Sequence, residues 1–165
     1  MKRTGVFSTA ALAIVCCLET GMVGAQQLSV KRALNLAVAK TIAAAAEKEA
    51  MANKWAMFIT IIDDSGTVLF VERLDDAQIG SYEVSLQKAE TALKFRRPTK
   101  SFEDLVNGGR PAVAKLPGVL PIQGGVPLMA DGKVIGAIGV SGGASSQDAQ
   151  VAMAGVAALE ALLKK

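Results

Sequence analysis

Residues 124–148 read GGVPLMADGKVIGAIGVSGGASSQD and decide the fold. Val126–Ala130 is a short apolar run, and Lys133–Val140 is rich in β-branched residues. Between them stands Asp131-Gly132, a dipeptide favoured in type I′ turns because both central residues need positive φ. The stretch therefore predicts a β-hairpin with a tight two-residue turn.

The second strand of this hairpin is interrupted by Gly136 and Gly139. Glycine weakens a strand, so two of them predict close approach by another backbone, a helix or a flat ligand. Residues 139–143 spell G-x-S-x-G, but a serine nucleophile of that kind needs a histidine, and the chain has none. Ser145 is expected to cap a helix, with Asp148 three residues later at the spacing of a capping box.

The N-terminus has the pattern of a secretory signal. A basic start, an apolar run over residues 5–18 and the small residues Val23-Gly24-Ala25 predict a signal peptide over residues 1–25. The remaining residues, 26–165, suit a single domain. The signal pattern implies that the mature chain is periplasmic or secreted and has no membrane span. Both cysteines of the chain lie inside the expected signal, so no cysteine site is expected in the mature chain.

Charge argues against nucleic acid as a partner. Without Lys2, Arg3 and Glu19, 16 basic and 14 acidic residues remain, a net charge of +2. The basic residues are scattered, and few aromatic side chains are available for stacking on bases.

The rest of the chain alternates helices and strands. Periodic apolar residues predict a helix from Ser29, as its N-cap, to about Ala52, and a second from about Gly80 to Arg96 with Tyr82, Leu86, Ala89 and Leu93 on one face. Apolar runs around the turn 63–66 predict an antiparallel strand pair. A short helix is expected over residues 102–106, and a last helix from Ser146 to about Leu163. Hairpins flanked by helices indicate an α+β fold with an antiparallel sheet of four strands.

Two segments leave alternatives open. Residues 110–125 carry three prolines and several glycines, which is typical of a lid or binding loop. Glu72, Arg73, Asp75 and Asp76 follow the second strand and form either a solvated turn or the polar rim of a pocket.

These residues together resemble the GlcG/HbpS family of haem-binding or haem-degrading proteins, which is related to the C-terminal domain of PduO-type proteins. The resemblance rests on residues 64–66, 73–77, 88–92, 97–99, 117–121, 124–127, 131–143 and 147–148. It implies a profilin-like α/β/α fold with a five-stranded antiparallel sheet and assembly as a homo-oligomer. For the secreted branch of the family it also implies binding of haem or iron in a sensory or accessory role. The fifth strand would have to come from the proline-rich segment.

The chain departs from relatives that ligate haem through histidine. The ligands that remain are Tyr82, the thioether of Met129 and, from the family pattern, the hydroxyls of Thr91 or Thr99. Propionate partners would be Arg96, Arg97 and Lys88, which are equally interpretable as surface charges or subunit contacts. The candidate ligand-binding residues are therefore Lys88, Thr91, Thr99, Arg96, Tyr82 and Met129.

The leading hypothesis is an exported, oligomeric protein that binds haem or a small acidic ligand in an accessory or sensory role. The alternative is an accessory or degradative enzyme acting on haem or a small hydroxy acid, with carboxylates such as Asp64, Asp76 and Asp148 as acid or base. A third possibility is a structural subunit whose apolar helices serve assembly. The lack of histidine and mature cysteine favours binding over catalysis.

Overall fold

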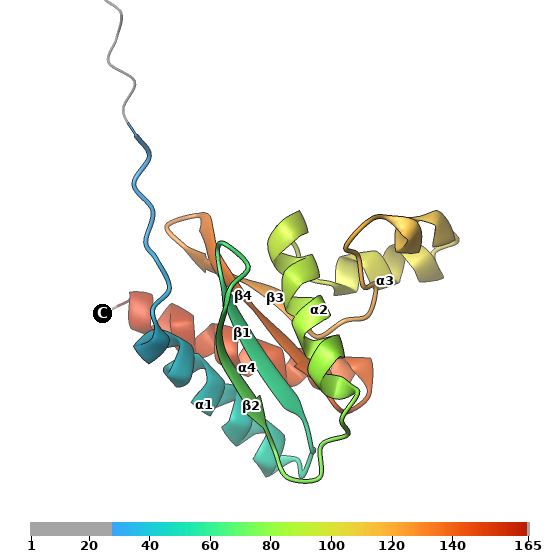
Figure 1. Cartoon of the computed structure of the whole chain (residues 1–165), viewed down its shortest axis with the longest axis horizontal. Helices are drawn as coiled ribbons and strands as arrows, with labels where there is room; N and C mark the ends of the chain where they lie inside the picture. The colour runs from blue at the N-terminus through green and yellow to red at the C-terminus, as the bar shows by residue number, and fades with distance from the viewer. Residues whose placement is uncertain (1–27, 165) are drawn as a thin grey trace, which may run out of the picture.

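The computed structural model of the chain describes residues 28–164 and arranges them in three layers. Helices α1 and α4 cover one face of a central sheet, and α2 crosses the other face (Figure 1). The elements in order are α1 (Leu36–Ala52), β1 (Phe58–Asp63), β2 (Val68–Arg73), α2 (Ser81–Phe95), α3 (Lys100–Asn107), the 3₁₀ turn η1 (Pro111–Lys115), β3 (Gly125–Ala130), β4 (Lys133–Ser141) and α4 (Ser145–Leu163). The α+β class predicted from the sequence is confirmed.

The sheet is fully antiparallel, with the strand order β2-β1-β4-β3. In the described residues it has four strands, so the expectation of a fifth is wrong. The segment that would have supplied it contains η1 and then runs without regular structure to Gly124. The β3–β4 turn is as predicted, because Asp131 and Gly132 have φ values of 49° and 72°.

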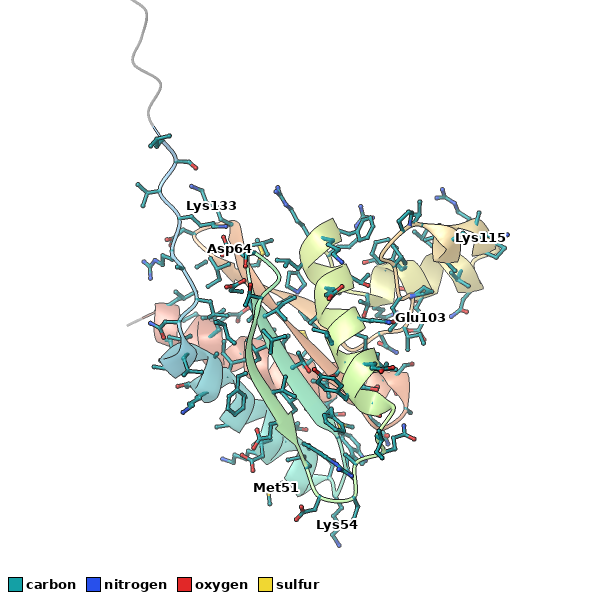
Figure 2. The ribbon with its side chains drawn as sticks, viewed as in Figure 1. Met51, Lys54, Asp64, Glu103, Lys115 and Lys133 are labelled. Atoms are coloured by element: carbon teal, nitrogen blue, oxygen red, sulfur yellow. The ribbon has the colours of Figure 1, made fainter. Side chains whose placement is uncertain are left out.

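This strand order places two hairpin turns at the same end of the sheet. β1 and β4 are antiparallel neighbours, and Asp63 at the end of β1 pairs with Gly136 near the start of β4. The β1–β2 turn therefore lies beside the β3–β4 turn, and Figure 2 shows Asp64 and Lys133 close to these tips. These turns come from segments about seventy residues apart in the chain.

Helix α2 packs unusually close to the sheet. A Cβ on Gly139 would meet the carbonyl of Ser85 and stand 2.6 Å from the amide nitrogen of Ala89. The interpretation of Gly139 as a site of close approach is confirmed, and the partner is the backbone of α2. Gly136 is approached instead by the carbonyl of Ile62 and by Leu34.

Close packing decides which face of α2 is buried. Ser81, Ser85, Lys88, Ala89, Thr91 and Ala92 face inward, whereas Tyr82 is 43% exposed. Of the predicted stripe, Ala89 is buried, and Leu86 and Leu93 are half-buried and pack against the buried cluster that includes Ala89. The prediction is wrong at Tyr82. Because α2 approaches the strand closely at Gly139, the side chains between helix and strand must be small or must extend along the helix.

Two helix starts also differ from expectation. α1 begins at Leu36, because Asn35 caps it by accepting a hydrogen bond from the amide of Val38 at 2.9 Å. Residues 28–33 are therefore not helical. α4 begins one residue earlier than expected, after Ala144, whose amide donates to Gln147 Oε1 at 2.9 Å.

The core lies between the sheet and the α1–α4 layer. Ile42, Ile59, Ile61, Ile138 and Val151 are completely buried there. Burial of each such side chain contributes about 1.5–3 kcal/mol. Within residues 28–164 no helix is long and apolar enough to cross a membrane.

Candidate functional site

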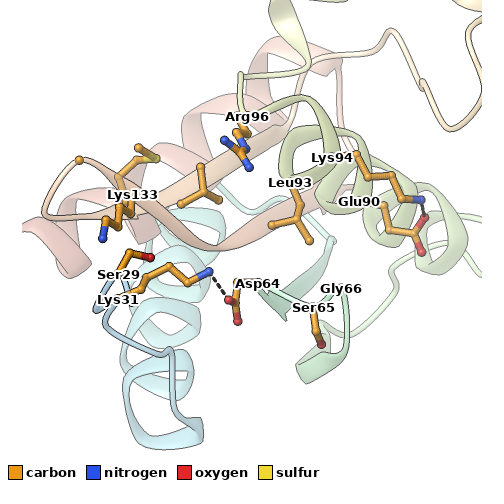
Figure 3. A pocket seen from close by; sticks show the side chains of 13 residues that line it. Ser29, Lys31, Asp64, Ser65, Gly66, Glu90, Leu93, Lys94, Arg96 and Lys133 are labelled. Carbon is orange, nitrogen blue, oxygen red and sulfur yellow. Dashed lines mark hydrogen bonds and ion pairs between the residues drawn. The ribbon is translucent and has the colours of Figure 1, made fainter. Parts of the chain in front are cut away.

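A large cavity opens at the end of the sheet where the two hairpin turns meet (Figure 3). We call it the basic cavity. Its volume is about 1020 Å³, at the upper end of the ~300–1,000 Å³ usual for small-molecule sites. It is lined by Ser29, Lys31, Asp64, Ser65, Gly66, Glu90, Leu93, Lys94, Arg96, Met129, Gly132, Lys133 and Val134.

Cations outnumber carboxylates in this lining by four to two. Both carboxylates are already paired, Asp64 with Lys31 and Glu90 with Lys94 at 2.8 Å. Arg96 makes no hydrogen bond or ion pair through its side chain to any residue in the range 28–164. The cavity therefore offers a positive charge that a ligand carboxylate could pair with.

The backbone of Arg96 is unusual. It is the C-cap of α2 and lies in the left-handed region, with φ at 52° and ψ at 37°. Glycine or asparagine is the usual residue in such a conformation at a helix end, because a larger side chain costs free energy there. A guanidinium held at this position, at the mouth of a cavity, is consistent with a functional requirement for its charge.

Met129 is brought to the cavity by an irregularity in β3. The register between β3 and β4 shifts between Leu128 and Met129. Leu128 is fully buried, whereas Met129 is 40% exposed and lines the cavity. A bulge of this kind redirects a side chain. Here it points a thioether, a soft metal ligand, toward the ligand space.

Of the six predicted site residues, the basic cavity brings together Arg96 and Met129. Thr91 and Thr99 do not line it and are almost completely buried. The hydroxyl of Thr91 donates to the carbonyl of Gly118 at 3.0 Å and accepts from the amide of Leu120 at 2.9 Å. Thr99 accepts from the amide of Gly125 at 2.9 Å. Both threonines therefore fasten the proline-rich segment to the helices.

Lys88 does not line the cavity. Its side chain is 1% exposed, and the ammonium group donates to Asp148 Oδ2 at 2.6 Å and to the carbonyl of Val140 at 3.0 Å. Asp148 in turn accepts from the amide of Gly143 at 2.9 Å. The pair ties α2 to the end of β4 and to the first turn of α4, where a carboxylate also faces the positive end of the helix dipole.

Burial is the main influence on this ion pair. Desolvation lowers the pKa of Lys88, although Asp148 and Glu103 act in the opposite direction. Desolvation likewise raises the pKa of Asp148, against the effect of Lys88 and of the amides of Gly143 and Gly142. Each partner is thus held in its charged form mainly by the other.

Tyr82 lies in the first turn of α2, far along the helix from Arg96. Its ring packs on Phe58 with 5.9 Å between centroids. The acidic group after β2 lines a separate, smaller cleft of about 480 Å³, which also contains Trp55. The polar-rim interpretation of Glu72, Arg73, Asp75 and Asp76 therefore has structural support, but these residues do not reach the basic cavity.

Sequence reasoning missed the cations Lys31 and Lys133 of the cavity. The signal that could have revealed them was the strand order, because it places residues near both hairpin turns at one end of the sheet. No group of three or more histidine, cysteine or acidic side chains within the described range is arranged to hold a metal ion.

Comparison with known proteins gives a consistent result. Residues 34–157 match the family described as "Haem degrading protein HbpS-like". Protein GlcG of Escherichia coli (strain K12) is 44% identical over 115 residues, which cover 69% of this chain and 85% of the relative. A crystal structure of HbpS superimposes with a TM-score of 0.72 at 32% identity, covering 79% of this chain and 93% of the other. A PduOC–haem complex gives 0.71 at 30% identity, with 77% and 95% covered.

Proposed function

Because the chain belongs to the HbpS-like family, whose description names haem degradation, we propose that it binds haem, or a related small acidic ligand, in the basic cavity. The observation that carries the proposal is the free guanidinium of Arg96 in a cavity of about 1020 Å³ with a net positive lining. The complex of the related PduOC domain with haem supports the same class of ligand.

The cavity residues fit the three parts of haem. Arg96 and Lys133 supply positive charge for the two propionates, and Leu93 with Val134 offers apolar surface to the ring. Met129 is the one lining residue with a sulfur ligand for iron, and the lining contains no histidine, cysteine or tyrosine. Bound haem would supply a redox-active iron, while the chain itself positions the ring and shields one side of it from water.

We further propose that the protein acts after export, in the periplasm or outside the cell, as a homo-oligomer with an accessory or sensory role. The signal pattern of residues 1–25, which lie outside the described residues, supports export. Apolar side chains available for contact with a second copy include Ile79, which is 80% exposed, and Met153, which is 51% exposed.

Haem degradation is a second candidate, and the description of the family favours it. Against it, both carboxylates of the cavity are paired with lysines, which leaves no free acid or base in the lining. Incubating the haem complex with ascorbate in air separates the two functions. A stable Soret band supports binding, and its progressive loss with release of iron supports degradation.

The test of the binding proposal is a haemin titration of the purified protein. We expect a shifted Soret band that saturates at a defined stoichiometry. Arg96→Gln removes the free charge and is expected to weaken binding about tenfold or more. Arg110→Gln is the matched control, because Arg110 is exposed just before η1 and does not line the cavity.

Met129→Leu preserves the volume of the side chain but removes the sulfur. We expect the position of the Soret band to change while the melting temperature of the apoprotein stays close to that of the parent. If the parent shows no saturable shift, or if Arg96→Gln binds haemin as tightly as the control, the assignment of the basic cavity is wrong.

A further inference from the structure

One wall of the basic cavity is made by residues 28–33, an extended segment that we call the N-terminal strap. It crosses the end of the sheet beside both hairpin turns (Figure 2). Lys31 pairs with Asp64 in the β1–β2 turn, and Arg32 Nε lies 2.8 Å from Asp131 Oδ2 in the β3–β4 turn. Lys133 also donates to the carbonyl of Val30. The strap thus bridges the two turns through charged groups.

No residue of the strap is buried in the apolar core. Leu28 and Val30 are 95% and 88% exposed, whereas Leu34, just beyond the strap, is 7% exposed and belongs to the main apolar core. The N-cap of α1 follows at Asn35. Leu34 and Asn35 therefore fix one end, and only solvent-accessible polar contacts hold the rest.

Contacts of this kind are weak. An exposed ion pair usually changes an equilibrium constant by no more than about fivefold, and salt screens it further. Opening of the strap is therefore expected to be frequent. Since Ser29 and Lys31 line the cavity, opening would remove a wall and one of its four cations. The other three belong to α2 and to the β3–β4 hairpin, and stay in place.

We propose that the N-terminal strap is a movable wall whose ion pairs to Asp64 and Asp131 control access of ligand to the basic cavity. The identity of the ligand rests on the proposed function, but the opening of the wall does not. Lys31 faces both Asp64 and the ligand space, as Figure 3 shows. A bound carboxylate can therefore compete with Asp64 for Lys31, which couples occupancy of the cavity to the position of the strap.

The test uses the full chain with both latches removed, Asp64→Asn with Asp131→Asn. Asparagine is tolerated at the positive φ of Asp131, so the hairpin turn should survive. The matched control is Asp104→Asn, which removes the exposed pair of Lys100 and Asp104 on α3, away from the cavity. All variants are made in the parent sequence and in a background that combines L93C with Cys16→Ser and Cys17→Ser. Leu93 lines the cavity, and maleimide would otherwise also label the two native thiols.

Two readouts follow the strap without any ligand. Trypsin cleavage after Lys31 and Arg32 and maleimide labelling of the thiol in L93C should both accelerate between about twofold and about twentyfold in the latch variant. Added salt should accelerate both in the parent, and the control should match the parent. Unchanged labelling of L93C would overturn the movable wall, even if cleavage became faster.

Haemin release into an excess of apomyoglobin tests control of ligand access. We expect release from the latch variant to be several-fold faster than from the parent and the control. Faster labelling with unchanged release would overturn the claim that the strap controls access. A parent that binds no haemin while labelling accelerates would refute the proposed ligand and leave the movable wall supported.

Discussion

The buried pair of Lys88 and Asp148 gives the sharpest prediction for stability. Lys88→Met keeps most of the length of the side chain but removes the ammonium group, so the carboxylate of Asp148 stays buried without its counter-charge. Only the amides of Gly143 and Gly142 would then stabilise its charge. Breaking a buried pair by removing one partner typically costs about 3–5 kcal/mol. That is a large fraction of the ~5–15 kcal/mol free energy of unfolding of a typical domain.

The second partner supplies the control. Asp148→Asn leaves the ammonium of Lys88 buried with neutral acceptors alone, such as the carbonyl of Val140, and without a counter-charge, and should also be strongly destabilising. In the double variant neither charge is left uncompensated. We therefore expect the two losses not to add, with a coupling free energy of about 1–3 kcal/mol in favour of the double variant.

The loss in Lys88→Met should also depend on pH. Burial raises the pKa of Asp148, and Lys88 acts to lower it, so the variant should have a still higher pKa at this carboxyl. In the unfolded chain the value is close to 3.8. The destabilisation should thus be smallest below that value and grow as the pH rises through the folded pKa of Asp148.

Urea unfolding of the parent and the three variants at about pH 4 and about pH 8 measures these differences. The parent slope m should be retained, since the same surface is exposed on unfolding. A cost of less than about 1 kcal/mol for Lys88→Met at pH 8, additive single losses, or a loss that grows toward acid pH would each refute the reasoning.

Three further predictions concern other parts of the chain. Gly139→Val should cost at least the ~1–3 kcal/mol of overpacking, because its side chain meets the backbone of α2; thermal unfolding should show it to be more damaging than Ile138→Val, at about 0.5–1.5 kcal/mol. Export should remove residues 1–25, so that intact mass shows a chain starting at Gln26; exported protein that keeps Met1 would contradict this. Light scattering at micromolar concentration should give a multiple of the monomer mass, and a monomer would count against assembly.

The sequence was sufficient to predict the elements whose signals are local. The β3–β4 hairpin follows from Asp131-Gly132 between two apolar runs, and α2 ends before Pro98 as proline requires. The starts of helices were less predictable where more than one residue could act as the N-cap. Ser29 looks like an N-cap, but Asn35 takes that role, and residues 28–33 are held by carboxylates of two distant turns.

The candidate site was only partly predictable because it is assembled from segments that meet through the strand order. Arg96 and Met129 were identified by residue type, but the sequence does not show that the C-terminal end of α2 and the end of β3 line the same cavity. Lys88 was misleading for a related reason. A lysine in a helix is usually solvated, and the burial of Lys88 depends on Asp148, which lies sixty residues later.

The glycine that brings α2 onto the sheet also accounts for the chemistry on both sides of the helix. With no Cβ at Gly139, the Ser85–Ala89 turn of α2 can touch β4. Lys88, which lies within this turn, is therefore buried, and its charge is compensated by the carboxylate of Asp148 at the start of α4. Leu93, one turn further along α2, is half-buried against the cluster that includes Ala89 and Ala137, and it also lines the basic cavity. Close packing in the middle of α2 thus fixes the position of its C-terminal end, which places Leu93 and the guanidinium of Arg96 at the basic cavity.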